Sequence, residues 1–215
     1  MPPLARRVAW ALLAAGVGGF LLIAATYDHE PLASLDSDVA TWVATDLPHA
    51  LELAARPFSW LGGWIGLTIL GVATALVLVR ERAWSDLLFL AAALIGSNVA
   101  VSVLKVWFDR DRPDIAPAVP LPGSSSFPSG HAASGAAGLG AIAVLAAERL
   151  PSRRARVALW IVVVAGGLAV GLSRIALGVH FVTDVVAGWC FGLAWLAACL
   201  LVRSHVATRA SSSER

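Results

Sequence analysis

The dominant feature of this sequence is a series of long apolar runs that few charged residues interrupt. Six runs stand out, at Val8–Thr26, Trp60–Val79, Asp86–Leu104, His131–Ala147, Val157–Leu172 and Val182–Val202. A run of about 20 apolar residues can span a bilayer, where a helix satisfies its own backbone hydrogen bonds. Charged residues make up 14% of the chain, whereas a soluble domain carries about 25%. The sequence therefore predicts an all-α, polytopic membrane protein with six transmembrane helices.

The charges between the runs predict the orientation. Arginines gather before the first run, in alternate loops and after the last run, at Arg6, Arg7, Arg80, Arg82, Arg149, Arg153, Arg154, Arg156, Arg203 and Arg209. Cytoplasmic loops carry such an excess of basic residues, so we expect both termini to be cytoplasmic and the protein to lie in the cell membrane. Arg6 and Arg7 before an apolar run also fit a signal peptide, although this run is long for one.

Residues 1–202 are predicted to form a single membrane domain, followed by a disordered cytoplasmic tail at 203–215. The segment 27–57 is too long for a plain turn. Apolar residues recur there at helical spacing, at Leu35, Val39, Trp42 and Val43. We expect one or two short amphipathic helices. They lie either on the outer membrane surface or against the bundle, and whether they contact lipid or gate a site stays open.

Two of the runs carry further information. The fourth is rich in Ala, Ser and Gly from Ala132 to Gly140. Small residues let membrane helices approach closely, so we expect this helix at the centre of the bundle. On the third run, Asn98, Ser102 and Lys105 share one helical face, and we interpret Asn98 as a hydrogen-bonding residue between helices rather than a catalytic one.

Composition also excludes several classes of function. The net charge is only +2 and no basic cluster alternates with aromatic residues, so we expect no nucleic-acid partner. Cys190 and Cys199 lie about 13 Å apart on one predicted helix, too far to form a disulfide with each other. The sequence has neither zinc-type Cys/His spacing nor an acidic cluster suited to Mg²⁺, so we expect no metal site.

A histidine and an aspartate stand four residues apart at the start of the sixth run. His180 and Asp184 would share one face of a helix. A carboxylate in that position fixes the imidazole tautomer and raises its basicity, which makes the other ring nitrogen a good nucleophile. On its own, the pair would be more typical of a structural His–Asp cap.

The segment Pro128–His131 (PSGH) opens the fourth run. Proline and serine before an apolar run are typical of a helix N-terminus, whose free N–H groups and positive dipole bind anions. Gly130 allows the backbone to approach a ligand closely. His131 would lie where it can protonate a departing oxygen. Taken alone, the same segment would be only a well-capped helix.

The segment Lys105–Pro113 (KVWFDRDRP) adds cations. A guanidinium binds two phosphate oxygens at once, and an ammonium acts as a point charge. We assign Lys105 and Arg112 to an anion site. Arg110 is interleaved with three aspartates, and we interpret it as part of a solvated mixed-charge loop and leave it out of the site.

The three segments together resemble a known family. The pattern K-x6-RP, PSGH and SR-x5-H-x3-D is similar to that of the type 2 phosphatidic acid phosphatase (PAP2) family, which shares its site with vanadium haloperoxidases. Every position of the pattern is filled, by Lys105, Arg112, Pro113, Pro128, Ser129, Gly130, His131, Ser173, Arg174, His180 and Asp184. The resemblance covers residues from about 58 to 202, and three ordered motifs are far more specific than one.

The resemblance implies a mechanism and a set of roles. His180 would attack phosphorus with Asp184 orienting it, and His131 would protonate the leaving oxygen. The phosphoryl oxygens would be held by Lys105, Arg112, Ser129, Gly130 and Arg174. Water would then hydrolyse the phosphohistidine, with no metal and no cofactor.

We therefore predict an integral-membrane lipid phosphatase that hydrolyses a lipid phosphomonoester or diphosphate at the extracytoplasmic face. Its substrate would be of the phosphatidic acid, phosphatidylglycerol phosphate or undecaprenyl diphosphate type, and its surroundings would be membrane lipid. Two alternatives remain: a vanadate-dependent oxidase on the same site, and a non-enzymatic transporter that binds an anion or a lipid. The sequence identifies neither the lipid nor the oligomeric state.

Overall fold

The computed structural model describes residues 3–213, and side chains up to residue 206. Its described part is helical and contains no strand. The elements in chain order are α1 (Pro3–Thr26), α2 (Leu32–Thr45), α3 (His49–Gly62), α4 (Trp64–Arg80), α5 (Trp84–Ala91), the π-helical turn η1 (Ala92–Gly96), α6 (Ser97–Phe108), α7 (Gly130–Arg149), α8 (Arg153–Ala176) and α9 (Val182–Ser213). The predicted all-α fold is confirmed.

Five segments are long and apolar enough to cross a membrane: α1, the continuous segment 84–108 (α5, η1 and α6), α7, α8 and the first part of α9. A sixth is formed only by α3 and α4 together, which are bent by 44°. Gly63 between them is extended, with φ −74° and ψ 172°. The predicted span Trp60–Val79 therefore differs from the structure, because Trp60 belongs to α3 and the straight part begins at Trp64.

The small residues of α7 place it at the centre of the bundle. In its most apolar window, 61% of the residues are buried, a larger share than in any other described span. A Cβ atom on Gly188 of α9 would lie 2.6 Å from the carbonyl oxygen of Ser129, and one on Gly192 would lie 2.3 Å from that of Ala133. Backbones so close exclude larger side chains, and the central position predicted for this helix is confirmed.

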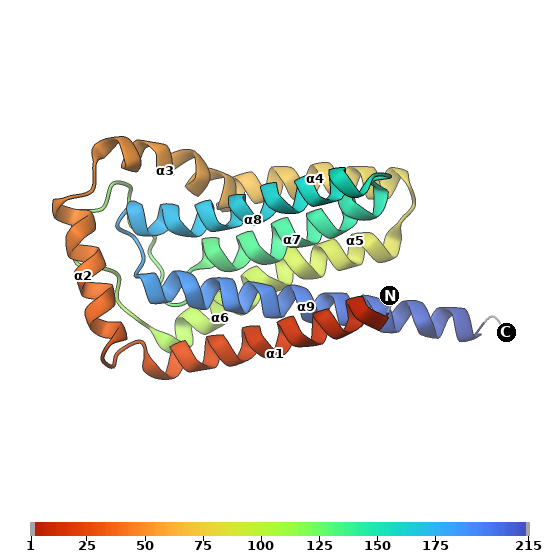
Figure 1. The fold of residues 1–215 in the computed structure, drawn as a ribbon, viewed down its shortest axis with the longest axis horizontal. Helices are drawn as coiled ribbons and strands as arrows, with labels where there is room; N and C mark the ends of the chain where they lie inside the picture. Colours follow the sequence, from red (N-terminus) through yellow and green to blue (C-terminus); the bar gives the residue numbers. More distant parts are fainter. Residues whose placement is uncertain (1–2, 214–215) are drawn as a thin grey trace.

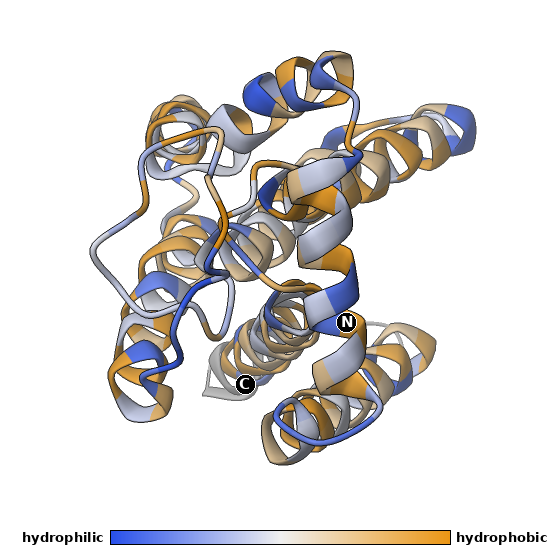
Figure 2. Ribbon diagram, turned by 90° about the vertical axis from the view of Figure 1, so that its left-hand side faces the viewer, coloured by the Kyte–Doolittle hydropathy of each residue, from blue (hydrophilic) through white to orange (hydrophobic). Residues whose placement is uncertain are grey.

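The bundle has two distinct ends (Figure 1). We call the end that α2 crosses the site end. Both chain termini point towards the other end, the terminal end, where α4 joins α5 and α7 joins α8. Figure 2, a view from the site end, shows hydrophilic residues along α2, α3 and the loops there, with mostly hydrophobic helices behind.

Short helices follow the first span, as predicted: α2 lies between the first two spans, and α3 leads into the bent second span that it forms with α4. Leu35 and Trp42 on the expected apolar face of α2 stay 42% and 48% exposed, so this face is free to contact lipid. The buried residue of α2 is instead an acid, Asp36. The predicted tail also differs from the structure: α9 continues as a helix through Ser213, and Arg203, where the tail was predicted to begin, pairs with Asp86 and Glu148.

Candidate active site

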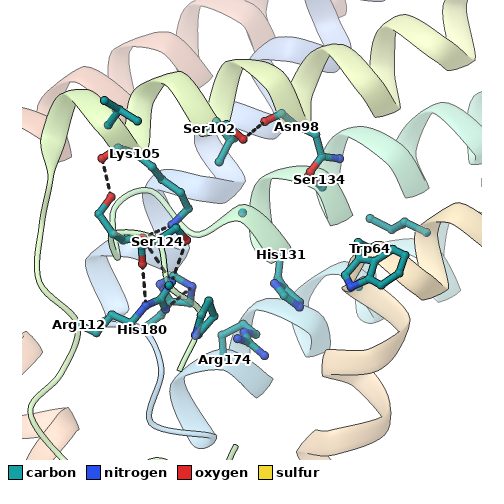
Figure 3. A pocket seen from close by; sticks show the side chains of 18 of the residues that line it. Trp64, Asn98, Ser102, Lys105, Arg112, Ser124, His131, Ser134, Arg174 and His180 are labelled. Carbon is teal, nitrogen blue, oxygen red and sulfur yellow. Dashed lines mark hydrogen bonds between the residues drawn. The ribbon is translucent and has the colours of Figure 1, made fainter. Parts of the chain in front are cut away.

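The three sequence motifs meet at the site end, around one cavity of about 660 Å³ (Figure 3). Lys105 comes from the last turn of α6 and Arg174 from the last turn of α8. His131 lies in the first turn of α7, and Arg112 and His180 lie in the loops after α6 and α8. All five line the cavity. Residues more than 70 positions apart in sequence are thus brought together. Three basic side chains, Lys105, Arg112 and Arg174, line the same cavity.

His180 lies in a tight turn between α8 and α9. Gly178 has φ +70°, which a residue with a side chain rarely adopts, and Val179 next to it is fully buried. In this turn His180 is only 4% exposed. Its Nδ1 atom lies 3.3 Å from Asp184 Oδ2 and 3.3 Å from Ser126 Oγ. Its other nitrogen, Nε2, lies 3.4 Å from Arg112 Nη1.

This geometry selects the tautomer of His180. A carboxylate accepts hydrogen bonds, so Nδ1 carries the proton and donates it to Asp184, while a guanidinium only donates, so Nε2 holds the lone pair. Burial, opposed by Asp184, lowers the pKa of His180 to about 4. The ring is therefore neutral near pH 7, with an unprotonated nitrogen facing the cavity.

Asp184 is fully buried and its oxygens are shared among several donors. Oδ2 accepts from the Ser126 hydroxyl and, at 3.0 Å, from the Phe181 amide. Oδ1 accepts from Arg110 Nη1 at 2.7 Å. The Ser129 amide donates to the Asp184 carbonyl at 2.9 Å, which joins the start of α7 to α9. The carboxylate thus lies behind His180 and away from the cavity. The predicted pairing is found, but His180 lies in the turn before α9 and the two residues do not share a helix face as the four-residue spacing assumed.

Arg110 is the main difference from the sequence prediction. It is not in a solvated loop: its side chain is 12% exposed and bridges Asp184 to Asp36 of α2, at 2.7 and 2.9 Å. The guanidinium also lies 4.4 Å from the ring centres of both Tyr27 and Phe181. Asp36, 74 residues away in sequence, accepts a hydrogen bond from Arg110 and pairs with it, so the guanidinium is held inside the fold.

The cations are held by backbone and hydroxyl oxygens. Arg112 donates to Val179 O at 2.6 Å and Ser124 O at 3.0 Å, and burial lowers its pKa below the ordinary value. Lys105 Nζ donates to the carbonyls of Ser125 and Ser126, and Arg174 donates to the hydroxyl of Ser59. Arg174 Nε is buried with no partner among the described residues. The arrangement thus keeps positive charge available for an anion in the cavity.

Of the two predicted phosphate-binding residues at the start of α7, Gly130 lines the cavity and Ser129 does not. Gly130 lines the cavity at the first residue of α7, where the helix N–H groups are free. Ser129 is fully buried, its hydroxyl finds no partner in the described part of the chain, and it does not line the cavity. Asn98 also differs from its interpretation: it donates to Leu94 O of its own helix, at 3.0 Å, and lines the cavity.

Sequence reasoning did not find Ser59, Ser126 or Thr183, which support Arg174, Asp184 and Arg110. Single hydroxyl residues carry no spacing signal that would have revealed them. Among the described residues, no group of three or more His, Cys, Asp or Glu side chains could hold a metal ion.

A family model described as the PAP2 superfamily matches residues 86–206, more than half of the chain. The chain belongs to the PAP2 superfamily. It is 34% identical over 190 residues to phosphatidylglycerophosphatase B of Bacillus subtilis, covering 81% of this chain and 86% of that protein. It is 38% identical over 167 residues to decaprenylphosphoryl-5-phosphoribose phosphatase of Mycobacterium tuberculosis, covering 72% and 84%.

Solved structures agree with this assignment. The crystal structure of a transmembrane PAP2-type phosphatidylglycerolphosphate phosphatase from Bacillus subtilis superposes with a TM-score of 0.82 at 28% identity, covering 89% of this chain and 97% of that one. Aquifex aeolicus LpxE, at 23% identity and a TM-score of 0.60, shares the fold over 77% and 94%. The predicted family, the polytopic fold and the assignment as a membrane phosphatase are confirmed.

Proposed function

We propose that this PAP2 protein hydrolyses a phosphomonoester or diphosphate of a membrane lipid through a phosphohistidine at His180. The observation that carries the proposal is the lone pair on His180 Nε2, which faces a cavity lined by Lys105, Arg112 and Arg174. A phosphoryl group bound by these cations would place its phosphorus before that nitrogen. The relatives named above act, by their names, on lipids that carry phosphate.

The reaction has two steps. In the first, His180 Nε2 forms a bond to phosphorus as the bond to the lipid oxygen breaks, and His131 gives its proton to that oxygen. In the second, water attacks phosphorus, His131 takes the water's proton, and the P–N bond breaks to release phosphate. Lys105, Arg112, Arg174 and the Gly130 amide hold the phosphoryl oxygens and stabilise their developing charge.

Asp184 and Arg110 have positioning roles in this scheme. Asp184 holds the Nδ1 proton and stabilises the ring as Nε2 gains a bond to phosphorus. Arg110 fixes Asp184 Oδ1 while Ser126 and Phe181 fix Oδ2. Ser129 contributes through its backbone N–H, which donates a hydrogen bond to the Asp184 carbonyl and fixes the start of α7, rather than through its hydroxyl.

We also propose that the site faces the extracytoplasmic side of the cell membrane. The basic residues Arg80, Arg149 and Arg153 are the last or first residues of α4, α7 and α8 at the terminal end, which the excess of positive charge assigns to the cytoplasm. The cavity lies at the opposite end. A lipid phosphate could then enter from the outer leaflet.

The experiment compares wild-type protein with His180→Ala in detergent, with phosphatidic acid and a polyprenyl diphosphate as substrates and released phosphate as the readout. Loss of the nucleophile should lower turnover by about three orders of magnitude or more. His205→Ala is the matched control, because that exposed histidine lies on α9 towards the terminal end and does not line the cavity. Near-normal phosphate release by His180→Ala would refute the mechanism, and activity without a membrane gradient would exclude transport as the sole function.

A further inference from the structure

The cavity continues past the phosphate-binding cations along the α6–α7 interface, into the membrane-spanning part. The neighbours of two glycines on α7 show which residues of the facing helix lie at the same depth in the bundle. A Cβ on Gly130 would lie 3.7 Å from Val101 and 3.9 Å from Lys105, whereas one on Gly138 would lie 2.5 Å from Leu94. The two helices thus run antiparallel in contact over two turns, about 12 Å.

Ser134 lies midway between those two glycines, and Asn98 lies midway between Leu94 and Ser102 on the facing helix. Ser134, Asn98 and Ser102 all line the cavity (Figure 3). Ser134 is one turn, about 6 Å, deeper than Gly130. A small group of polar side chains therefore lies beyond the cations, where the leaving group of a lipid substrate would extend.

The hydroxyl of Ser134 is the part of this group that needs a partner. Ser134 is 3% exposed and its Oγ has no hydrogen-bond partner among the described residues. By contrast, Ser102 donates to Asn98 O at 2.9 Å, and Asn98 uses one of its two amide N–H bonds on Leu94 O. A buried hydroxyl without a partner is costly, and a ligand that accepts its proton recovers that cost.

Candidate lipids differ in what they present at this depth. A glycerolipid phosphate carries ester carbonyl oxygens a few bonds beyond the leaving oxygen, about one helical turn away. A prenyl phosphate carries only hydrocarbon there, which would leave the hydroxyl unpaired. An ether-linked glycerolipid has the same backbone and chains as the ester but no carbonyl acceptor.

We propose that Ser134, with Asn98 and Ser102, forms a subsite that binds the ester carbonyls of a glycerolipid phosphate and favours it over a prenyl phosphate. This subsite rests on the proposed function, because it acts on the leaving group of the same reaction. Ser134 donates to a carbonyl oxygen, and the second amide N–H of Asn98 is a further donor in reach of the same cavity.

The test measures kcat/KM of wild type and Ser134→Ala on three substrates in identical mixed micelles: diacyl phosphatidic acid, its dialkyl ether analogue and farnesyl monophosphate. The variant should lose about threefold to tenfold on the diacyl lipid, the worth of one hydrogen bond, and less than about twofold on the other two. Ratios of rates measured on one preparation do not depend on how much protein is folded.

Ser97→Ala is the control, since Ser97 is buried on α6, bonds Leu94 O at 3.2 Å and does not line the cavity. It should leave all three ratios unchanged. An equal change on all three substrates, or none on the diacyl lipid, overturns the subsite alone. If the wild type released phosphate from none of the three substrates, that result would instead overturn the proposed function.

Discussion

Two clusters of ion pairs, one at each end of the bundle, have the same chemistry in different surroundings. At the site end, the Arg110 cluster joins Arg110 to Asp36 and Asp184, with side chains 12%, 2% and 0% exposed. At the terminal end, the Arg203 cluster joins Arg203 to Asp86 and Glu148, with side chains 22%, 14% and 49% exposed. Both link residues far apart in the chain.

The difference in burial separates their roles. Charges withdrawn from water depend on their partners, so removing one partner of a buried pair is severe, whereas solvent-exposed pairs contribute little. The Arg110 cluster also includes the carboxylate that faces His180 Nδ1, whereas no member of the Arg203 cluster lines the cavity. We infer that the first cluster fixes the catalytic geometry and the second mainly joins helix ends.

The largest effect is expected for Arg110→Ala. It leaves Asp36 and Asp184 buried without their cation, which should lower the free energy of unfolding by about 3–5 kcal/mol. In the protein that remains folded, kcat should fall about 100-fold or more with KM little changed, because Asp184 loses its fixed position. Thermal unfolding and phosphate release measure the two effects.

Arg110→Lys separates charge from geometry. Lysine keeps the positive charge but lacks the fork that binds Asp36 and Asp184 at once. It should restore much of the stability and only part of kcat. Wild-type kcat in Arg110→Ala would contradict a positioning role for the Arg110 cluster.

Burial at the site end also predicts the acid limb of the pH profile. Burial lowers the pKa of His180 to about 4 from its usual 6.5. His180 is protonated, and its nucleophilic lone pair lost, only as pH falls through about 4. Activity should therefore persist at pH 5–6 and kcat/KM should fall about tenfold per pH unit below about 4, after correction for substrate ionisation. An acid limb from His180 at pH 6 or above would contradict the lowering of its pKa by burial.

The smallest effect is expected for Arg203→Ala. Its partly exposed pairs with Asp86 and Glu148 should contribute less than about 1 kcal/mol each. We expect kcat and KM within about twofold of wild type and a small decrease in the unfolding temperature that high salt reduces further. A loss of activity as large as that of Arg110→Ala would remove the distinction between the two clusters.

The sequence predicted the parts of this protein that periodic or fixed spacing encodes. Apolar runs predicted the spans, small residues predicted the central place of α7, and the four-residue interval predicted that Asp184 lies behind His180. The break at Gly63 was missed because the apolar run continues across it, so hydropathy does not mark the bend.

The interpretation of Arg110 failed for a physical reason. An arginine between aspartates is usually solvated, and its local sequence contains no sign of a partner on α2. Only the fold brings Asp36, Tyr27 and Phe181 around the guanidinium. Similarly, the unpaired hydroxyl of Ser134 is invisible in a run of small residues, because it depends on the facing surface of α6.

The most direct test of the account is to trap the covalent intermediate. Protein mixed with phosphatidic acid labelled in its phosphate, quenched in alkali within milliseconds and digested should yield a phosphorylated peptide containing His180, absent from His180→Ala. Phosphate on another residue such as His131, or no phosphorylated residue while turnover proceeds, would contradict the central claim that His180 is the nucleophile.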